Sequence, residues 1–291
     1  MDDGYAHFRT GLFLPDNRSE SFGRGMRSMR FRNTVITAVF VLALWTCAYS
    51  QTPAAMERGL ATDLDVISAT GNYGGNSDEA KSSAANKSVR DKLIAAGTRL
   101  DILKYPFAKL KDKMYIATSK DGRLRIYSWD MQDGGTMHDF DCVYQFQGKS
   151  GKVFTWTKPE TAEGDFGSFY TDIFQLDATD GAIYLTVSTF IGSTSLAGQS
   201  ISVVRIDGDK FVPDAKLIKT GSGLNNSISF SYDFFSVVGR PDRPVKLFTW
   251  DAAKQSFRFP VVIEDKKIPQ GRVTDKFITY KFDGKYFVKV S

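Results

Sequence analysis

From Leu103 onward, short runs of apolar and aromatic residues alternate with turns rich in Gly, Asp and Asn. This alternation is typical of antiparallel strands. The clearest turn is Asp121-Gly122, which separates the strand-like runs 114–118 and 124–129 and predicts a hairpin. Further strands are predicted at 140–146, 152–157, 170–176, 182–190, 200–206, 227–237, 244–250, 272–282 and 285–290. The sequence therefore predicts a mainly β protein.

A degenerate repeat runs through the strand-like part. Five of its runs end in an acidic residue, at Asp130, Asp177, Asp207, Asp251 and Asp283. Asp suits a turn because its short side chain accepts hydrogen bonds from the backbone amides just ahead. Strand–turn–strand units of about 40 residues are typical of propeller blades, and the segment 116–130 is similar to a blade of many β-propellers. We expect an antiparallel, propeller-like meander, with a β-sandwich or barrel as the alternative, since any meander can produce strands that end in Asp.

One amphipathic helix is predicted ahead of the strands, over about 77–96. Asn76 stands at its capping position, Glu79 completes a capping box, and Gly97 ends the helix. Its apolar residues recur at helical spacing, at Val89, Leu93, Ala96 and Leu100. The preceding residues 51–76 are polar and rich in small residues, which predicts a flexible linker. Residues 77–291 are expected to form a single β-rich domain.

Residues 1–50 have the organisation of an export signal. Four arginines lie within 24–32, an apolar run follows over 35–48, and small residues precede a cleavage position after Ser50. The apolar run is short for a bilayer span, which needs about 20 residues. We expect a leader with a cleaved signal peptide and export to a periplasm or the extracellular space. The alternative is an uncleaved signal anchor that holds the protein in a membrane through residues 34–50.

The charge and the cysteine and histidine content restrict the partners and the chemistry. The formal net charge of the chain is +5, and residues 1–50 hold six Arg and four acidic residues, so the remainder carries +3. Such a small, dispersed charge does not indicate binding to nucleic acid. Only His138 and Cys142 remain after removal of the signal. We therefore expect no intramolecular disulfide, no His-rich or four-cysteine zinc site, and no cofactor.

The densest polar cluster of the sequence spans residues 129–139 and contains the only His beyond the signal, three Asp and the pair Gly134-Gly135. In a functional interpretation the cluster is a ligand-binding loop. In a structural interpretation it is a wide hairpin loop, where Gly supplies positive φ and Asp caps the turn. The functional candidates are Trp129 as an apolar platform and Asp133 for ligand binding, and His138 beside Asp139, together with Asp130, for acid–base chemistry.

Motifs for other chemistries are incomplete. With one His and no Gly-x-Ser-x-Gly elbow, serine hydrolysis lacks its usual components. The segment 148–150 resembles the end of a phosphate loop, but Val143 stands where the first glycine is required. Cys142, among aromatic residues, is expected to be a buried thiol. Paired carboxylates for glycoside hydrolysis remain an alternative, with the candidates Asp130, Asp133, Asp139, Asp172, Asp177 and Asp180.

These observations favour an exported, non-catalytic binding or interaction protein of a bacterial-type cell envelope, with a protein or a glycan as its partner. One alternative is a carboxylate-based glycan hydrolase on a β scaffold. The other is a signal-anchored scaffold protein of the envelope, which contacts the membrane only through its N-terminal segment.

Overall fold

The computed structural model describes residues 51–73, 76–159, 166–264 and 266–290, and residues 51–291 group into one compact unit. The predicted signal peptide or anchor, including residues 34–50, lies outside the described residues. Within the part of the chain that the structure describes, no helix is both long enough and apolar enough to cross a membrane.

The first described element is a helix, α2 (Pro53–Thr70), in the segment that the sequence predicted to be a flexible linker. The Thr52 side chain caps it by accepting from the amide of Ala55, and Pro53 occupies the first turn, where its missing N–H costs nothing. The linker prediction is wrong because the segment carries a narrow stripe of apolar residues at helical spacing, although most of its residues are polar or small. This stripe is buried in the core and consists of Met56, Leu60, Leu64 and Ile67.

The predicted helix over 77–96 is present as α3 (Glu79–Ala95), which packs against α2. Its cap is Asp78 rather than Asn76, since the Asp78 carboxylate accepts from the amide of Lys81. Gly97 follows the helix, and a Cβ there would lie 1.8 Å from Cγ2 of Thr155, so this close approach requires glycine. A short third α-helix, α4 (Leu100–Lys104), and a 3₁₀ helix, η2 (Ala108–Leu110), complete the helical part. The expectation of a single N-terminal helix is therefore wrong.

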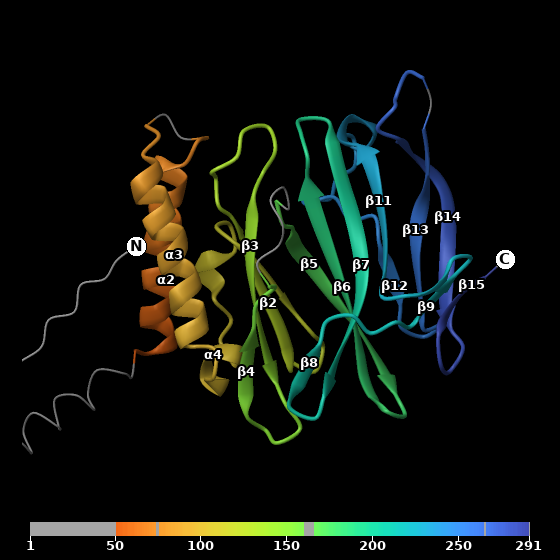
Figure 1. The fold of residues 1–291 in the computed structure, drawn as a ribbon, viewed down its shortest axis with the longest axis horizontal. Coiled ribbons are helices and arrows are strands. Elements are labelled where there is room, and N and C mark those ends of the chain that lie inside the picture. The colour runs from red at the N-terminus through yellow and green to blue at the C-terminus, as the bar shows by residue number, and fades with distance from the viewer. Residues whose placement is uncertain (1–50, 74–75, 160–165, 265, 291) are drawn as a thin grey trace, which may run out of the picture. The chain divides into compact units, whose positions relative to one another are not determined.

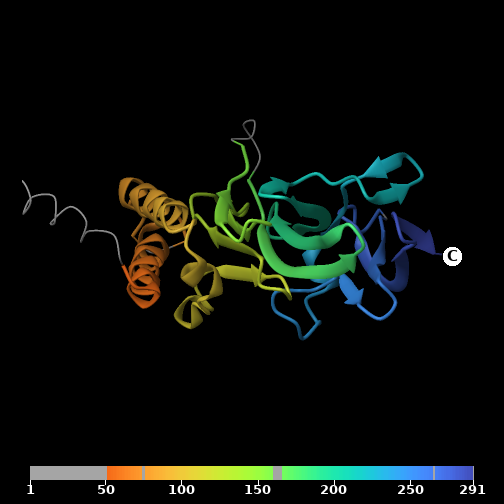
Figure 2. The same cartoon turned by 90° about the horizontal axis from the view of Figure 1, so that it is seen from below.

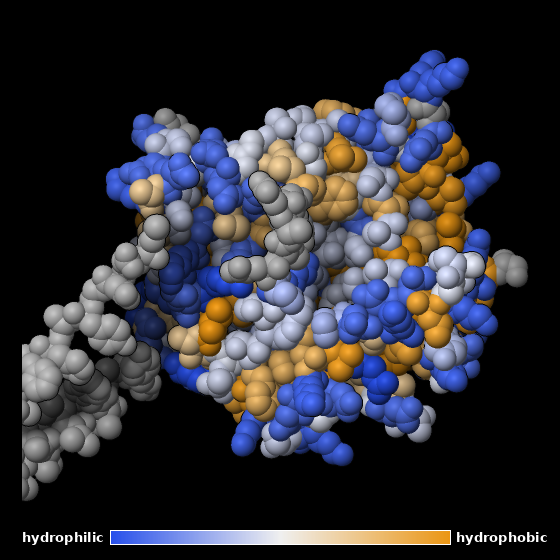
Figure 3. Space-filling view, in the orientation of Figure 1, coloured by the Kyte–Doolittle hydropathy of each residue, from blue (hydrophilic) through white to orange (hydrophobic). Residues whose placement is uncertain are grey.

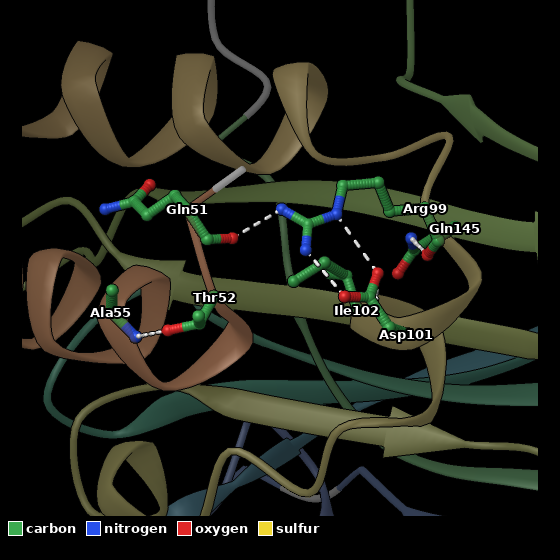
Figure 4. Close-up of polar contacts among 7 residues, drawn as sticks. All are labelled: Gln51, Thr52, Ala55, Arg99, Asp101, Ile102 and Gln145. Atoms are coloured by element: carbon green, nitrogen blue, oxygen red, sulfur yellow. Dashed lines mark hydrogen bonds and ion pairs between the residues drawn. The ribbon is translucent and has the colours of Figure 1, made fainter. Parts of the chain in front are cut away.

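Arg99 connects the beginning of α2 to the segment between α3 and α4 (Figure 4). Its Nη1 donates to the carbonyl of Gln51 over 2.7 Å, while Nε and Nη2 bind the Asp101 carboxylate at 3.0 and 2.6 Å. The amide of Gln145 in the neighbouring sheet donates to the carbonyl of Arg99 over 3.2 Å. The same amide donates to the carbonyl of Gly97 in a buried contact, so Gln145 attaches the helical layer to the sheet.

The first sheet, which we call the helix-side sheet, is an antiparallel meander of four strands in chain order. Its turn at Asp121-Gly122 confirms the predicted hairpin, with Gly122 at a φ of 68°. The strands are β1 (Tyr115–Thr118), β2 (Leu124–Asp130), β3 (Phe140–Gln147) and β4 (Val153–Trp156).

The second sheet, which we call the middle sheet, has the strand order β11-β7-β6-β5, with β8 paired to β7. All of its pairings are antiparallel. The strands are β5 (Phe169–Ala178), β6 (Gly181–Ile191), β7 (Leu196–Asp207), β8 (Lys210–Val212) and β11 (Ser227–Asp233).

The third sheet, which we call the C-terminal sheet, has the order β10-β9-β15-β14-β13-β12 and one parallel pairing, between β15 and β9. The sequence did not predict β13, because Pro260 interrupts its pattern. Pro260 lies at a bulge, where a strand tolerates the missing N–H. The strands are β9 (Ile218–Thr220), β10 (Gly223–Asn225), β12 (Thr249–Asp251), β13 (Ser256–Ile263), β14 (Arg272–Phe282) and β15 (Phe287–Val290).

The helices and the three sheets follow one another as layers (Figures 1 and 2). On β2, Tyr127 and Trp129 belong to the core shared with the helices, whereas Leu124 and Ile126 belong to the core shared with the middle sheet. The middle sheet is likewise covered on both faces, because Leu185 packs into the core shared with the C-terminal sheet. Burial on both faces explains why β2 is buried at nearly every position.

The protein is therefore mainly β with antiparallel sheets, as predicted, and none of the described sheets closes into a barrel. Several of the Asp residues that end strands cap turns, as the sequence indicated. Asp130 accepts from the amide of Gln132, Asp251 from that of Lys254, and Asp283 from that of Tyr286.

Candidate functional site

The polar cluster predicted over 129–139 forms the connection between β2 and β3, and it contains a His–Asp pair. Nδ1 of His138 lies 2.6 Å from Oδ2 of Asp130. The sequence paired His138 with its neighbour Asp139, but the structure pairs it with Asp130 at the other end of the loop. The reason is the hairpin itself, which brings the last residue of β2 opposite the residues that enter β3.

Trp129 is a core residue and not a ligand platform. Its side chain is 0% exposed, and its indole N–H donates to Oδ1 of Asn86 on α3 over 2.9 Å. Alternation along β2 places Trp129 on the face that the helices cover. The sequence could not choose between this face and a solvent face, because it does not show which face of β2 the helices α2 and α3 cover.

Two further candidates, Asp133 and Asp139, form a carboxyl pair in the loop. Burial, and then the negative charge of Asp139, raise the pKa of Asp133.

The remaining carboxylate candidates lie on other elements. Asp172 on β5 forms an ion pair with Lys246 at 2.8 Å. Asp177 accepts from the side chain of Gln175 over 2.7 Å near the β5–β6 turn. The structure therefore brings together Asp130, Asp133 and Asp139 but not Asp172, Asp177 or Asp180.

Tyr73, which the sequence did not single out, completes the cluster around His138. The centroids of the two rings lie 4.7 Å apart, and the Tyr73 hydroxyl donates to the carbonyl of Met137. Burial, and then the negative charges of Asp130, Asp139 and Asp133, raise the pKa of Tyr73 to about 12. No local signal marks this residue, because it follows α2 in the segment predicted to be a linker.

His138 also borders a cavity of about 370 Å³ where β1, the middle sheet and the segment before β12 meet. The backbone amide of His138 donates to the carbonyl of Ile191 at the end of β6, so the loop is fastened to the rim. Tyr115 and Phe169 stack with a centroid distance of 4.1 Å in this cavity. We call this cavity the aromatic pocket, and its aromatic lining residues are Tyr115, His138, Phe169, Tyr232 and Phe234.

The aromatic pocket has a polar atom without a partner in its wall. Thr189 on β6 is 6% exposed, and its Oγ1 makes no hydrogen bond. Among the described residues, the only buried side-chain polar atoms without a hydrogen-bond partner are Oγ1 of Thr189 and Oγ of Ser82. Each of the two residues lines a cavity.

Gln199 holds the far wall of the pocket in place. Its amide donates to the carbonyl of Val245 over 2.5 Å and accepts from the amide of Leu247 over 3.0 Å. Arg243, which precedes the cis peptide bond to Pro244, donates to the carbonyls of residues 238, 240 and 242. The wall is therefore built from hydrogen-bonded backbone rather than from a loose loop.

Comparison with protein-family models, with curated proteins and with solved structures found no match to this chain.

Proposed function

We propose that this chain is an exported, non-catalytic binding protein of a bacterial-type cell envelope, and that it holds a small molecule in the aromatic pocket. The observation that carries the proposal is the buried Oγ1 of Thr189, which has no hydrogen-bond partner in the pocket wall.

A buried hydroxyl without a partner lowers stability by about 1–3 kcal/mol. A ligand that brings one polar atom to Thr189 removes this cost. The rest of the wall is mainly apolar and aromatic, which suits a flat apolar body. The ligand class is therefore a small ring-containing molecule with one hydrogen-bonding group.

His138 supplies a second polar contact at the rim of the pocket. With Asp130 accepting from Nδ1–H, a neutral imidazole keeps Nε2 as an acceptor. Binding is favoured over catalysis because the nearby serine hydroxyl is already engaged. Oγ of Ser193 accepts from the amides of Ser195 and Leu196, so it is a turn residue rather than an activated nucleophile.

The test uses p-cresol and toluene, two probes that differ by one hydroxyl group, with affinities measured by calorimetry on the full chain. We expect p-cresol to bind about five- to tenfold more tightly than toluene, which corresponds to about 1 kcal/mol for one hydrogen bond. In Thr189→Val this preference disappears while toluene still binds. Because valine also removes a buried unpartnered hydroxyl, the variant is expected to be at least as stable as the parent protein.

Thr186→Val is the matched control. Thr186 lies on the same strand and is also buried, but its hydroxyl donates to the carbonyl of Ser202. This variant should lose some stability and keep the preference for p-cresol. Failure of both probes to bind, or equal affinities in the parent protein, contradicts the proposal.

Export is tested by determining the N-terminal sequence and the location of the protein made in a bacterial cell. N-terminal sequencing that begins at Gln51 supports a cleaved signal peptide and a periplasmic or extracellular protein. A membrane-bound product that retains residues 34–50 supports the signal-anchored scaffold instead.

We also propose that the three sheets are blade-like units of a propeller-type stack. The support is that β1–β4 follow chain order within one sheet, that β12–β15 are neighbours within another, and that successive sheets pack face to face. In a propeller, successive sheets are rotated about one central axis. An experimental structure in which the three sheets are not related by rotation about a common axis contradicts this arrangement.

A further inference from the structure

The second buried hydroxyl without a partner is Oγ of Ser82, a residue that lines a different cavity on the helical side of the 130–139 loop. This cavity has a volume of about 560 Å³, within the range of about 300–1,000 Å³ that is typical of ligand sites. We call it the polar cleft, and the lining residues used here are Asn72, Ser82, Asn86, Arg90, Asp133 and Asp141. Ser82 is 5% exposed, which makes its missing partner costly.

Both basic side chains that line the polar cleft are held in ion pairs, and the lining also includes the carboxyl groups of Glu79 and Asp133. Nη1 of Arg90 lies 2.5 Å from Oδ1 of Asp141, and Nζ of Lys87 lies 2.5 Å from Oδ2 of Asp91. A bound anion has to compete with these pairs and is repelled by the two further carboxyl groups, whereas a neutral ligand leaves the pairs intact. Among the described residues, no group of three or more His, Cys, Asp or Glu side chains is arranged to hold a metal ion.

The remaining polar groups suit a ligand that donates and accepts at several positions. The lining includes serine hydroxyls, amides, a guanidinium and carboxyl groups. On the face of the molecule in Figure 3, α2 and α3 present a mainly hydrophilic surface. Neighbouring hydroxyl groups of a sugar, each able to donate and accept, match such a wall better than an apolar or singly functional ligand does.

The walls of the polar cleft are held by hydrogen bonds before any ligand arrives. The Asn86 amide donates to the carbonyls of Ser82 and Met131, and the Asn72 amide donates to the carbonyl of Asp133. At Gly71 a Cβ would lie 2.5 Å from Cβ of Gln132, so the end of α2 and the loop touch. Such preorganisation reduces the entropy that binding would otherwise cost.

We propose that the polar cleft is a second binding site, distinct from the aromatic pocket, and that it takes a neutral carbohydrate of one or two sugar units with a hydroxyl group bonded to Ser82. The inference stands on the cleft alone and does not require the aromatic pocket to bind anything.

The test measures binding of glucose, galactose, N-acetylglucosamine, maltose and inorganic phosphate to the full chain by calorimetry or ligand-detected NMR. We expect at least one neutral sugar to bind with a Kd below about 10 mM, which is a weak but measurable affinity. Ser82→Ala should weaken that binding about fivefold through loss of one hydrogen bond. Alanine is the best helix former, so the variant should fold.

Thr189→Val serves as the cross-control, because it alters the aromatic pocket and should leave sugar binding unchanged. Ser82→Ala in turn should leave the preference for p-cresol over toluene unchanged, so the two proposals fail separately. The inference is overturned if no sugar of the panel binds, if Ser82→Ala binds sugar as tightly as the parent protein, or if phosphate alone binds and loses affinity in Ser82→Ala.

Discussion

The indole N–H of Trp129 donates to Oδ1 of Asn86 over 2.9 Å, and both side chains are buried where α3 covers the helix-side sheet. Asn86 uses its amide nitrogen as well, donating to the carbonyl of Met131 over 2.9 Å. One side chain thus satisfies a donor on β2 and an acceptor in the loop that follows it. Asn86 therefore links α3 both to β2 and to the loop.

We expect Asn86→Ala to lower the free energy of unfolding by about 2–4 kcal/mol, because it leaves the Trp129 N–H and the Met131 carbonyl without partners. Chemical denaturation measures this change. Ser83→Ala, at the exposed neighbouring position on α3, is the control and should change stability by less than about 0.5 kcal/mol. Equal stability of the two variants would show that the buried hydrogen bonds contribute little.

A second prediction distinguishes a packed helix from a linker over 51–76. Leu60 is 0% exposed in the core beneath α2. We expect Leu60→Ala to lower the free energy of unfolding by about 2–5 kcal/mol, the usual range for a buried leucine. Thr62→Ala on the exposed side of the same helix is the control. If urea unfolding of Leu60→Ala matches that of Thr62→Ala, the segment does behave as a linker.

A third prediction concerns the wall of the aromatic pocket. Gln199→Leu removes both hydrogen bonds to the segment 245–247 and buries the Val245 carbonyl and the Leu247 amide without partners. We expect a loss of about 2–4 kcal/mol in stability and weaker binding of both p-cresol and toluene. Gln175→Leu, at a half-buried position with exposed hydrogen bonds, should leave binding of both probes unchanged. Unaltered toluene binding in Gln199→Leu contradicts a role for Gln199 in shaping the wall.

The carboxyl pair in the loop leads to a pH-dependence prediction. Burial, followed by the charge of Asp139, holds the pKa of Asp133 above its ordinary value of 3.8. Between 3.8 and this raised pKa the native state holds more protons than the unfolded state, so stability falls as the pH rises. We therefore expect Asp133→Asn to be more stable than the parent protein at neutral pH, with the difference shrinking as the pH is lowered toward 3.8.

Asp251→Asn provides a control of opposite sign in the same urea titrations. The amide of Lys254 lowers the pKa of Asp251, so this carboxylate stabilises the fold above pH 3.8 and loses that effect as the pH falls through its folded pKa. The variant should be less stable than the parent protein at neutral pH and converge with it in acid. If Asp133→Asn is also less stable than the parent protein at neutral pH, then the fold stabilises the ionised form of Asp133.

Features that depend on neighbours in the chain were predictable from the sequence. The hairpin at Asp121-Gly122 requires a left-handed glycine between two strand-like runs, and both requirements are visible locally. The helix over Glu79–Ala95 was predicted within a few residues for the same reason. Pro260 hid β13, because the sequence does not reveal that a bulge accommodates the proline.

By itself, then, the sequence determined a mainly β chain, the hairpin at Asp121-Gly122, one of its helices and the crowding of polar residues into the 130–139 loop. Only the tertiary structure decided that α2 and α3 cover one face of β2, which makes Trp129 a core residue. It also decided that His138 pairs with Asp130 and lies against Tyr73. Strand periodicity defines two faces but not what covers each face, so the assignment depends on packing between segments far apart in the chain.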